Sequence, residues 1–208
     1  MIDEKDKFEN TPLHMAATFN NVKVVELLLK NGADVTSFDL SGQNVLHKAA
    51  RNGNNKVVLA VFRHLDKEKR KTNEILKELM EKRDGGGNTP FMLATHSTDT
   101  METFFGQSQL REYVDILLMT PNKVDDLPIH KACRYLFFRS RWLNNNLFLP
   151  HYNRSGDQTT VEFLLKHSNE YYEEEDYVNA SNRFYETPLF FAAQHGDWPD
   201  LVQFLFEM

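Results

Sequence analysis

The stretch "NTPLHMAATFNNVKVVELLLKNGAD", residues 10–34, determines the fold class of this chain. Thr11 can cap a helix, and Pro12 suits a first helical turn because its missing N–H has no partner to lose there. In the second half, Val25 and Leu29 belong to an apolar stripe with the three- and four-residue spacing of an amphipathic helix. Gly32 can adopt the left-handed conformation that ends such a helix. The stretch therefore predicts two short helices joined by a tight turn.

The opening phrase of this stretch occurs four more times in the 208-residue chain, as "QNVLHKAA", "NTPFMLAT", "DLPIHKAC" and "ETPLFFAA". The positions equivalent to Thr11 are Asn44, Thr89, Leu127 and Thr187, so the spacings are 33, 45, 38 and 60 residues. One two-helix unit cannot bury its apolar face alone, but stacked copies bury their faces together. We therefore predict five stacked units.

A basic period of 33 residues with a T-P-L-H-x-A core resembles the ankyrin repeat family over nearly the whole chain. The resemblance implies an all-α solenoid of stacked helix-turn-helix units with projecting hairpin loops, forming a single domain over residues 1–208. The predicted units cover about residues 6–38, 39–83, 84–121, 122–181 and 182–208. The predicted insertions cover about residues 66–82, 97–109, 136–158 and 169–178.

The insertions leave alternatives open. In the second unit, "NEILKELMEKRD" (73–84) is either an added helix, which we favour, or the true outer helix. In the third unit we place the outer helix at "LREYVDILLM" (110–119). The fourth-unit insertion is rich in aromatic residues, including Trp142, and either covers an end of the stack or forms a partner-binding arm. The last helix, 200–208, is apolar with no polar capping unit after it, so we expect a fragment of a longer protein or a docked final face.

Composition narrows the class of protein. The net charge of −6 argues against a nucleic-acid partner, which would require a concentrated basic face. No apolar stretch is long enough to suggest a membrane span, and the acidic start lacks the core of a secretory signal. Cys133 is the only cysteine, which excludes an internal disulfide and favours a reducing compartment. We expect a cytoplasmic protein.

The residues that could carry chemistry favour structural roles. His14, His47 and His130 share one position of the phrase, where Met92 and Phe190 stand in the other copies. A position that accepts phenylalanine is not catalytic. Cys133 lies three residues after His130, but two ligands are too few for zinc, and its position is a small packed one. The "DGGG" run, 84–87, lacks the Lys and Ser/Thr of a phosphate loop. We predict no catalytic residue, cofactor or metal.

The resemblance also implies where a partner protein would bind, namely on the concave surface made by hairpin tips and inner helices. Aromatic and arginine side chains dominate known interfaces, so they are the preferred anchors. The candidate residues are Phe8, Thr18, Phe19, Leu40, Gln43, Arg51, Asn52, His96, Arg134, Tyr135, Trp142, Arg183, Phe184 and Gln194.

The predicted function is that of a non-catalytic scaffold which binds a partner protein through its concave face and insertion loops. The chain would be part of a longer regulatory protein, or of a bacterial effector acting in the host cytoplasm. The alternatives are the cytosolic ankyrin region of a membrane cation channel and the targeting module of a larger enzyme.

Overall fold

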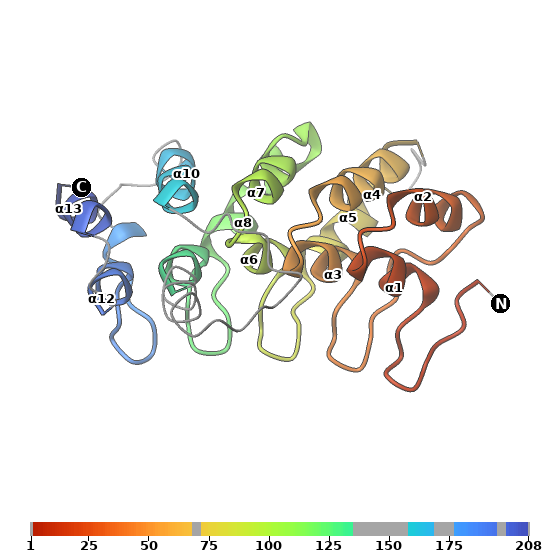
Figure 1. Cartoon of the computed structure of the whole chain (residues 1–208), viewed down its shortest axis with the longest axis horizontal. Helices are drawn as coiled ribbons and strands as arrows, with labels where there is room; N and C mark the ends of the chain where they lie inside the picture. The colour runs from red at the N-terminus through yellow and green to blue at the C-terminus, as the bar shows by residue number, and fades with distance from the viewer. Residues whose placement is uncertain (1, 68–71, 135–157, 169–176, 195–198, 208) are drawn as a thin grey trace, which may run out of the picture.

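The computed structural model describes residues 2–67, 72–134, 158–168, 177–194 and 199–207. Its helices lie in two rows, with hairpin loops projecting beyond one of them (Figure 1). No strand occurs among the described residues. The predicted all-α solenoid of stacked helical units with projecting hairpins is confirmed.

Each unit contributes one helix to the inner row, beside the hairpins, and one to the outer row. The inner helices are α1 (Pro12–Thr18), α3 (Val45–Arg51), α6 (Pro90–Ala94), a helix described over 128–134, and α12 (Pro188–Ala193). The outer helices are α2 (Val22–Lys30), α4 (Asn55–Lys67), α7 (Thr98–Phe105), α10 (Gln158–Ser168) and α13 (Pro199–Glu207). Three further elements are α5 (Thr72–Glu81), the 3-10 helix η1 (Ser108–Tyr113) and α8 (Val114–Met119).

The repeated phrase starts four of the five inner helices in the same way. The side chains of Thr11, Asn44, Thr89 and Thr187 each accept a hydrogen bond from the N–H three residues later. This bond satisfies one of the N–H groups that a helix start leaves without a partner. The capping side chain is thus the local reason why these four units begin at the phrase, whereas the fourth unit has Leu127 at this position.

The hairpins are closed by a second repeated device, an aspartate or asparagine five residues before the capping position. In the second unit, Asp39 Oδ1 accepts hydrogen bonds from the N–H groups of Ser41 and Gln43, both at 2.8 Å. Equivalent pairs of bonds reach the side-chain oxygens of Asp6, Asp84, Asn122 and Asn182. Five loops of different sequence therefore share one shape.

Neighbouring hairpins are linked by one backbone hydrogen bond each. The N–H of Leu40 donates to Phe8 O at 3.0 Å, and the N–H of Gly85 donates to Ser41 O at 2.7 Å. The same bond joins Lys123 to Gly86 and Arg183 to Val124. The hairpins therefore form a continuous ladder along one edge of the stack.

The residue two positions before each capping residue has a positive φ. These residues are Glu9, Gly42, Gly87, Asp125 and Tyr185, with φ between 61° and 81°. Glycine adopts this left-handed region freely, whereas a residue with a side chain is strained there. Tyr185 is the bulkiest residue at this position.

The second unit contains a third helix. The outer helix α4 packs between α2 and α7, whereas α5 packs on α4 and α6. At the end of α5 the carbonyl of Leu79 accepts a hydrogen bond from Asn44 Nδ2 at 2.9 Å, which ties the added helix to the start of α3. In this unit α5 occupies the place of the loop that follows α2 in the first unit.

The third unit differs from the expected arrangement. We expected an insertion over about 97–109 and an outer helix at 110–119, but α7 packs against α4 in the outer row. Ser97 caps α7, and Met101 and Phe104 face the core, where the Phe104 ring makes edge contacts with Phe62 and Phe91. The polar residues of "TDTMETFF" obscure this helix in the sequence.

Candidate functional site

The shared histidines of the phrase tie consecutive units together. Each Nδ1 atom accepts a hydrogen bond from the N–H of the capping position. Each Nε2 atom donates to a carbonyl just before the next hairpin or at its end. The acceptors are Ser37 O, Asn88 O and Ala180 O, for His14, His47 and His130 respectively, at 3.1, 3.1 and 2.9 Å. Burial lowers the pKa of all three imidazoles, and that of His47 to about 4. They are neutral structural groups at physiological pH.

Cys133 lies in a fully buried position beside these contacts. Burial raises the pKa of its thiol to about 12, so it is protonated at neutral pH and lacks the thiolate character of a nucleophile. Both ring nitrogens of the neighbouring His130 are engaged by backbone groups, so His130 is not positioned as its base. No group of three or more potential metal ligands occurs among the residues that the structure describes.

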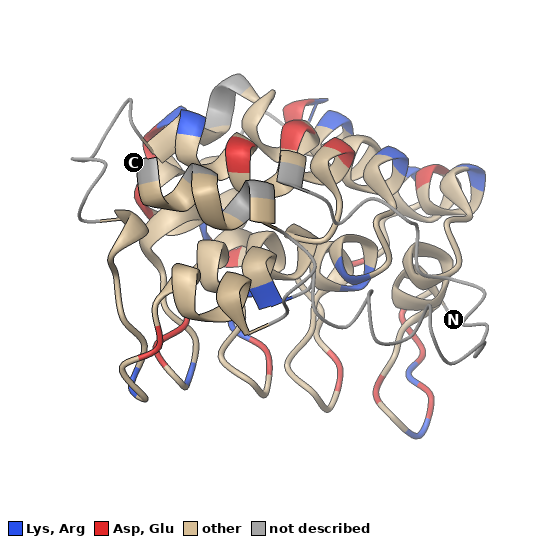
Figure 2. Ribbon diagram, turned by 60° about the vertical axis from the view of Figure 1, so that its left-hand side comes forward, with Lys and Arg blue, Asp and Glu red and all other residues tan. Residues whose placement is uncertain are grey.

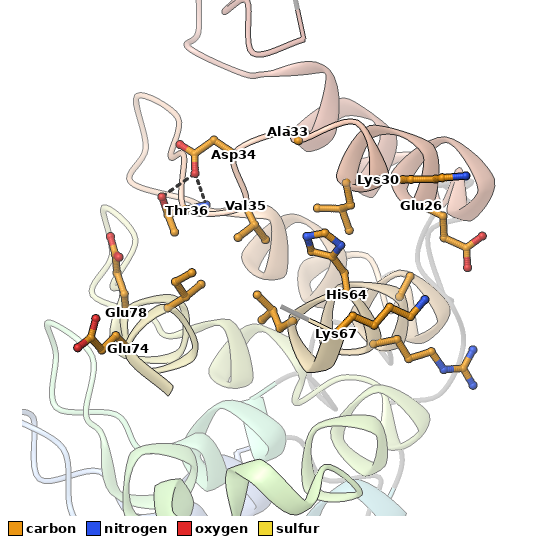
Figure 3. Close-up of a pocket in the computed structure, with 16 residues that line it drawn as sticks. Glu26, Lys30, Ala33, Asp34, Val35, Thr36, His64, Lys67, Glu74 and Glu78 are labelled. Atoms are coloured by element: carbon orange, nitrogen blue, oxygen red, sulfur yellow. Dashed lines mark hydrogen bonds between the residues drawn. The ribbon is translucent and has the colours of Figure 1, made fainter. Parts of the chain in front are cut away.

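A pocket of about 1340 Å³ opens between the end of α2, the loop that follows it, α4 and α5. Figure 3 shows the carboxylates of Glu74 and Glu78 on one side, and the side chains of Lys30, Lys67 and Glu26 on the other. The buried Val35 is among the apolar residues that line the pocket. Acidic and basic side chains therefore lie together on the side of the pocket formed by α2. This arrangement lacks the convergent acid and base of a catalytic site.

The candidate surface instead follows the hairpin ladder and the inner helices. Phe8 and Leu40 are joined by the first backbone bond of the ladder, and both residues are more than half exposed. Phe184 is equally exposed at the far end of the ladder, and Phe19 is exposed at the end of α1. Four of the predicted contact residues are therefore exposed to solvent.

The arginines on this surface are paired with acidic residues of the hairpins. Arg51 Nη2 lies 3.2 Å from Asp84 Oδ2, and Arg183 Nε lies 3.3 Å from Asp125 Oδ2. Arg134 Nη1 lies 3.0 Å from the fully buried Asp126, and its guanidinium stacks on Phe191. Figure 2 shows basic and acidic residues together on the hairpin loops. These arginines hold the hairpins in place through their ion pairs, and their side chains remain partly exposed.

Several predicted residues are less suited to contact a partner. Gln43 and His96 are buried. Each also makes a hydrogen bond inside the chain: Gln43 donates to Asp84 of the next hairpin at 3.3 Å, and His96 bonds to Leu93 O at 2.9 Å. Thr18 and Asn52 are half-buried and bond to carbonyls of their own helices. Gln194 is exposed at the end of α12. Tyr135 and Trp142 lie outside the described residues.

The structure adds two exposed apolar side chains to this surface that we did not predict. Met15 is exposed on α1, and Tyr185 is 89% exposed beside Phe184 at the tip of the fifth hairpin. The signal for Tyr185 was available, since it occupies the left-handed position that holds glycine in two other units. A strained, exposed aromatic residue is a recurrent mark of a binding site.

We expect Tyr185→Gly to stabilise the chain by about 1 kcal/mol, because glycine removes the left-handed strain at this position. Chemical denaturation followed by circular dichroism measures the change. Asp125→Gly, at the equivalent position of the fourth hairpin, relieves the same strain at a less bulky residue but also removes the ion pair between Asp125 and Arg183. A destabilised Tyr185→Gly variant would mean that the ring makes contacts that outweigh the strain.

Comparison with known proteins identifies the class. Residues 1–72 match the family model for ankyrin repeats in three copies. The chain is 39% identical over 64 residues to the nuclear factor NF-kappa-B p105 subunit of Gallus gallus, which covers 31% of this chain and 6% of that protein. It is 26% identical over 204 residues, 95% of its length, to transient receptor potential cation channel subfamily A member 1 of Homo sapiens, covering 14% of that protein. It is 48% identical over 56 residues to the E3 ubiquitin-protein ligase XBAT33 of Arabidopsis thaliana, covering 26% of this chain and 11% of that protein.

These matches identify ankyrin repeats in residues 1–72, and the stacked helix pairs and the histidine bonds extend the same architecture to the later units. Ankyrin repeats are protein–protein interaction modules and are generally not catalytic. The chain spans at most 14% of the length of these three relatives. Within the described residues no helix is both long and apolar enough to cross a bilayer.

Proposed function

We propose that this chain is a non-catalytic module that binds a partner protein through its concave face, with the hairpin tips and the ends of the inner helices as the contact surface. It would serve a longer regulatory protein in the cytosol. The observation that carries this proposal is the exposure of Phe8, Leu40, Phe184 and Tyr185 along one hairpin edge.

Exposed apolar residues on the tips are unfavourable for an isolated chain. Tip positions can be polar or glycine, as Ser41 and the run Gly85–Gly87 show. Large apolar side chains instead occur in the first two hairpins and the fifth, where they lie on the outside of rigid loops held by two hydrogen bonds each. Rigid aromatic groups give affinity because little conformational freedom is lost on binding.

A specific test is capture of partner proteins on the immobilised chain, with wild type compared with Phe8→Ala/Leu40→Ala. We expect the double variant to lose affinity for the principal partner by about 10- to 100-fold, the range for removing one or two interface anchors. Phe206→Ala is the control, since Phe206 is 74% exposed on α13, away from the hairpins. Equal capture by all three proteins would contradict the proposal.

A second candidate function is supported by the channel relative, which aligns with 95% of this chain. Under this proposal the chain is part of the ankyrin region of a longer membrane protein, and the concave face binds another part of the channel or a regulator. Fractionation of cells that express the tagged full-length gene product tests the proposal. Full-length product found entirely in the soluble fraction would rule it out.

A further inference from the structure

The inner helices carry only positive charges, although the chain as a whole has a net charge of −6. No Asp or Glu occurs in the inner helices over the ranges that the structure describes. Their charged residues are Lys48, Arg51, Lys131 and Arg134, at the same two positions of "HKAAR" and "HKACR" in the second and fourth units. Positive charge is therefore concentrated on the row of helices that borders the hairpins.

The carboxylates that pair with the two arginines lie beneath them. Asp84 and Asp126 are 6% and 0% exposed, whereas the side chains of Arg51 and Arg134 are 45% and 33% exposed. Both carboxylates also accept hydrogen bonds from N–H groups of the hairpins. A partner that approaches the inner helices therefore meets the guanidinium groups before the carboxylates.

The ion pairs leave donors of both arginines available. A guanidinium group carries five N–H donors. Among the described residues, only Nη2 of Arg51 has an acceptor, which is Asp84 Oδ2 at 3.2 Å. Both terminal nitrogens of Arg134 contact Asp126, but its Nε atom has no acceptor in the same part of the chain. The remaining N–H groups can donate to a partner.

A partner that covers this face must offer acceptors to these donors, because a charged donor that loses water without a new acceptor opposes binding. Carboxylates are the best match among protein groups. They neutralise the charge, and their two oxygens fit the planar fork of a guanidinium group.

We propose that the partner of the concave face is an acidic peptide segment, whose carboxylates bind Arg51 and Arg134. This inference rests on the proposed function and adds the chemistry of the partner. The segment runs along the inner row from the second unit to the fourth, past α6, which has no charged residue. Its apolar side chains reach the exposed Leu40 and Phe184 on the hairpin tips.

Fluorescence anisotropy with labelled deca-glutamate and the 208-residue chain tests this charge recognition. We expect saturable binding at about 50 mM salt that weakens as the salt concentration is raised, because salt screens exposed charges. Arg51→Gln/Arg134→Gln should weaken the binding about tenfold, the loss expected when strong charge-assisted contacts are removed.

The matched control is Lys23→Gln/Lys56→Gln, which removes the same two positive charges from exposed positions on α2 and α4 in the outer row. This control should bind deca-glutamate like wild type. Circular dichroism shows whether each variant is folded. Because loss of Arg134 leaves the buried Asp126 without its cation, Arg51→Gln alone is the second variant, with an expected loss of about threefold.

Three results would overturn the proposal. The first is no binding of deca-glutamate at about 1 mM chain, or an equal loss of binding in the control. The second is a ten-nucleotide RNA that binds more tightly than deca-glutamate and loses affinity in the same arginine variants. The third is partner capture that depends on Phe8 and Leu40 but is unchanged in Arg51→Gln/Arg134→Gln. That third result would leave the proposed function standing and remove only the acidic partner.

Discussion

Gly87→Ala is expected to destabilise the chain by about 3 kcal/mol, the sum of left-handed strain and overpacking. Gly87 has φ of +81°, and a Cβ atom there would lie 2.7 Å from the backbone nitrogen of Lys123 and 2.9 Å from its Cγ atom. Relief of that clash would push the third and fourth hairpins apart. The displaced backbone nitrogen is the one that donates to Gly86 O in the ladder, so the bond between the hairpins would be lost as well.

Gly32→Ala is the matched control for this effect. Gly32 has a similar φ of +84°, but no atom lies within 4 Å of the position that a Cβ would take. It should therefore lose only the strain of the left-handed conformation, about 1 kcal/mol. Urea denaturation of both variants measures the difference. Equal losses in the two variants would show that the ladder contact at Gly87 adds nothing to stability.

The second large effect is a loss of stability in mild acid. Burial lowers the pKa of His47 to about 4 in the folded chain, against an ordinary value of 6.5. A group with a depressed folded pKa stabilises the fold above its unfolded pKa, and this stability is lost as the pH falls from 6.5 towards 4. We expect His47 alone to reduce the free energy of unfolding by about 2 kcal/mol between pH 7.5 and pH 5. The pKa values of His14, His96 and His130 are lowered by the same cause and act in the same direction.

His47→Met measures how much of the acid-induced loss of stability is due to His47. Methionine is chosen because Met92 already occupies the equivalent position in the third unit. At pH 7.5 the variant should be less stable by about 1 to 3 kcal/mol, since the Asn88 carbonyl and the Asn44 N–H lose their partner. Its stability should fall less steeply with acid than that of the wild type. Urea titrations at several pH values measure both quantities, and parallel profiles for the two proteins would rule out His47 as a source of the pH dependence.

The sequence predicted the parts of the fold that local chemistry determines. Thr11, Pro12 and their equivalents act through bonds within one turn, so the start of each inner helix could be predicted from single residues. The helix α7 could not be predicted in this way, because Thr98, Thr100 and Thr103 are weak helix formers and its position depends on packing against α4. Tertiary packing outweighed local propensity there.

The exposure of a candidate residue could be predicted where it lies at the tip of a hairpin. Phe8 and Leu40 are exposed because hairpin tips project from the stack whatever their sequence. Gln43 is buried although it was predicted to contact a partner, because its hydrogen-bond partner comes from the next hairpin. Asp84 reaches Gln43 across 41 residues, a separation set by the added helix α5. This contact depends on how far apart the second and third hairpins lie along the chain, so it could not be predicted from a short sequence motif.

The inner helices α1, α3 and α6 and the outer helices α2, α4 and α7 each pack on their immediate neighbours in the row. A pulling force applied to the two ends of such a stack passes through every interface in series, so the least stable interface yields first while the others stay intact. The stack would then lengthen in separate steps, one unit at a time, and each step would extend the reach of whatever is attached to its ends.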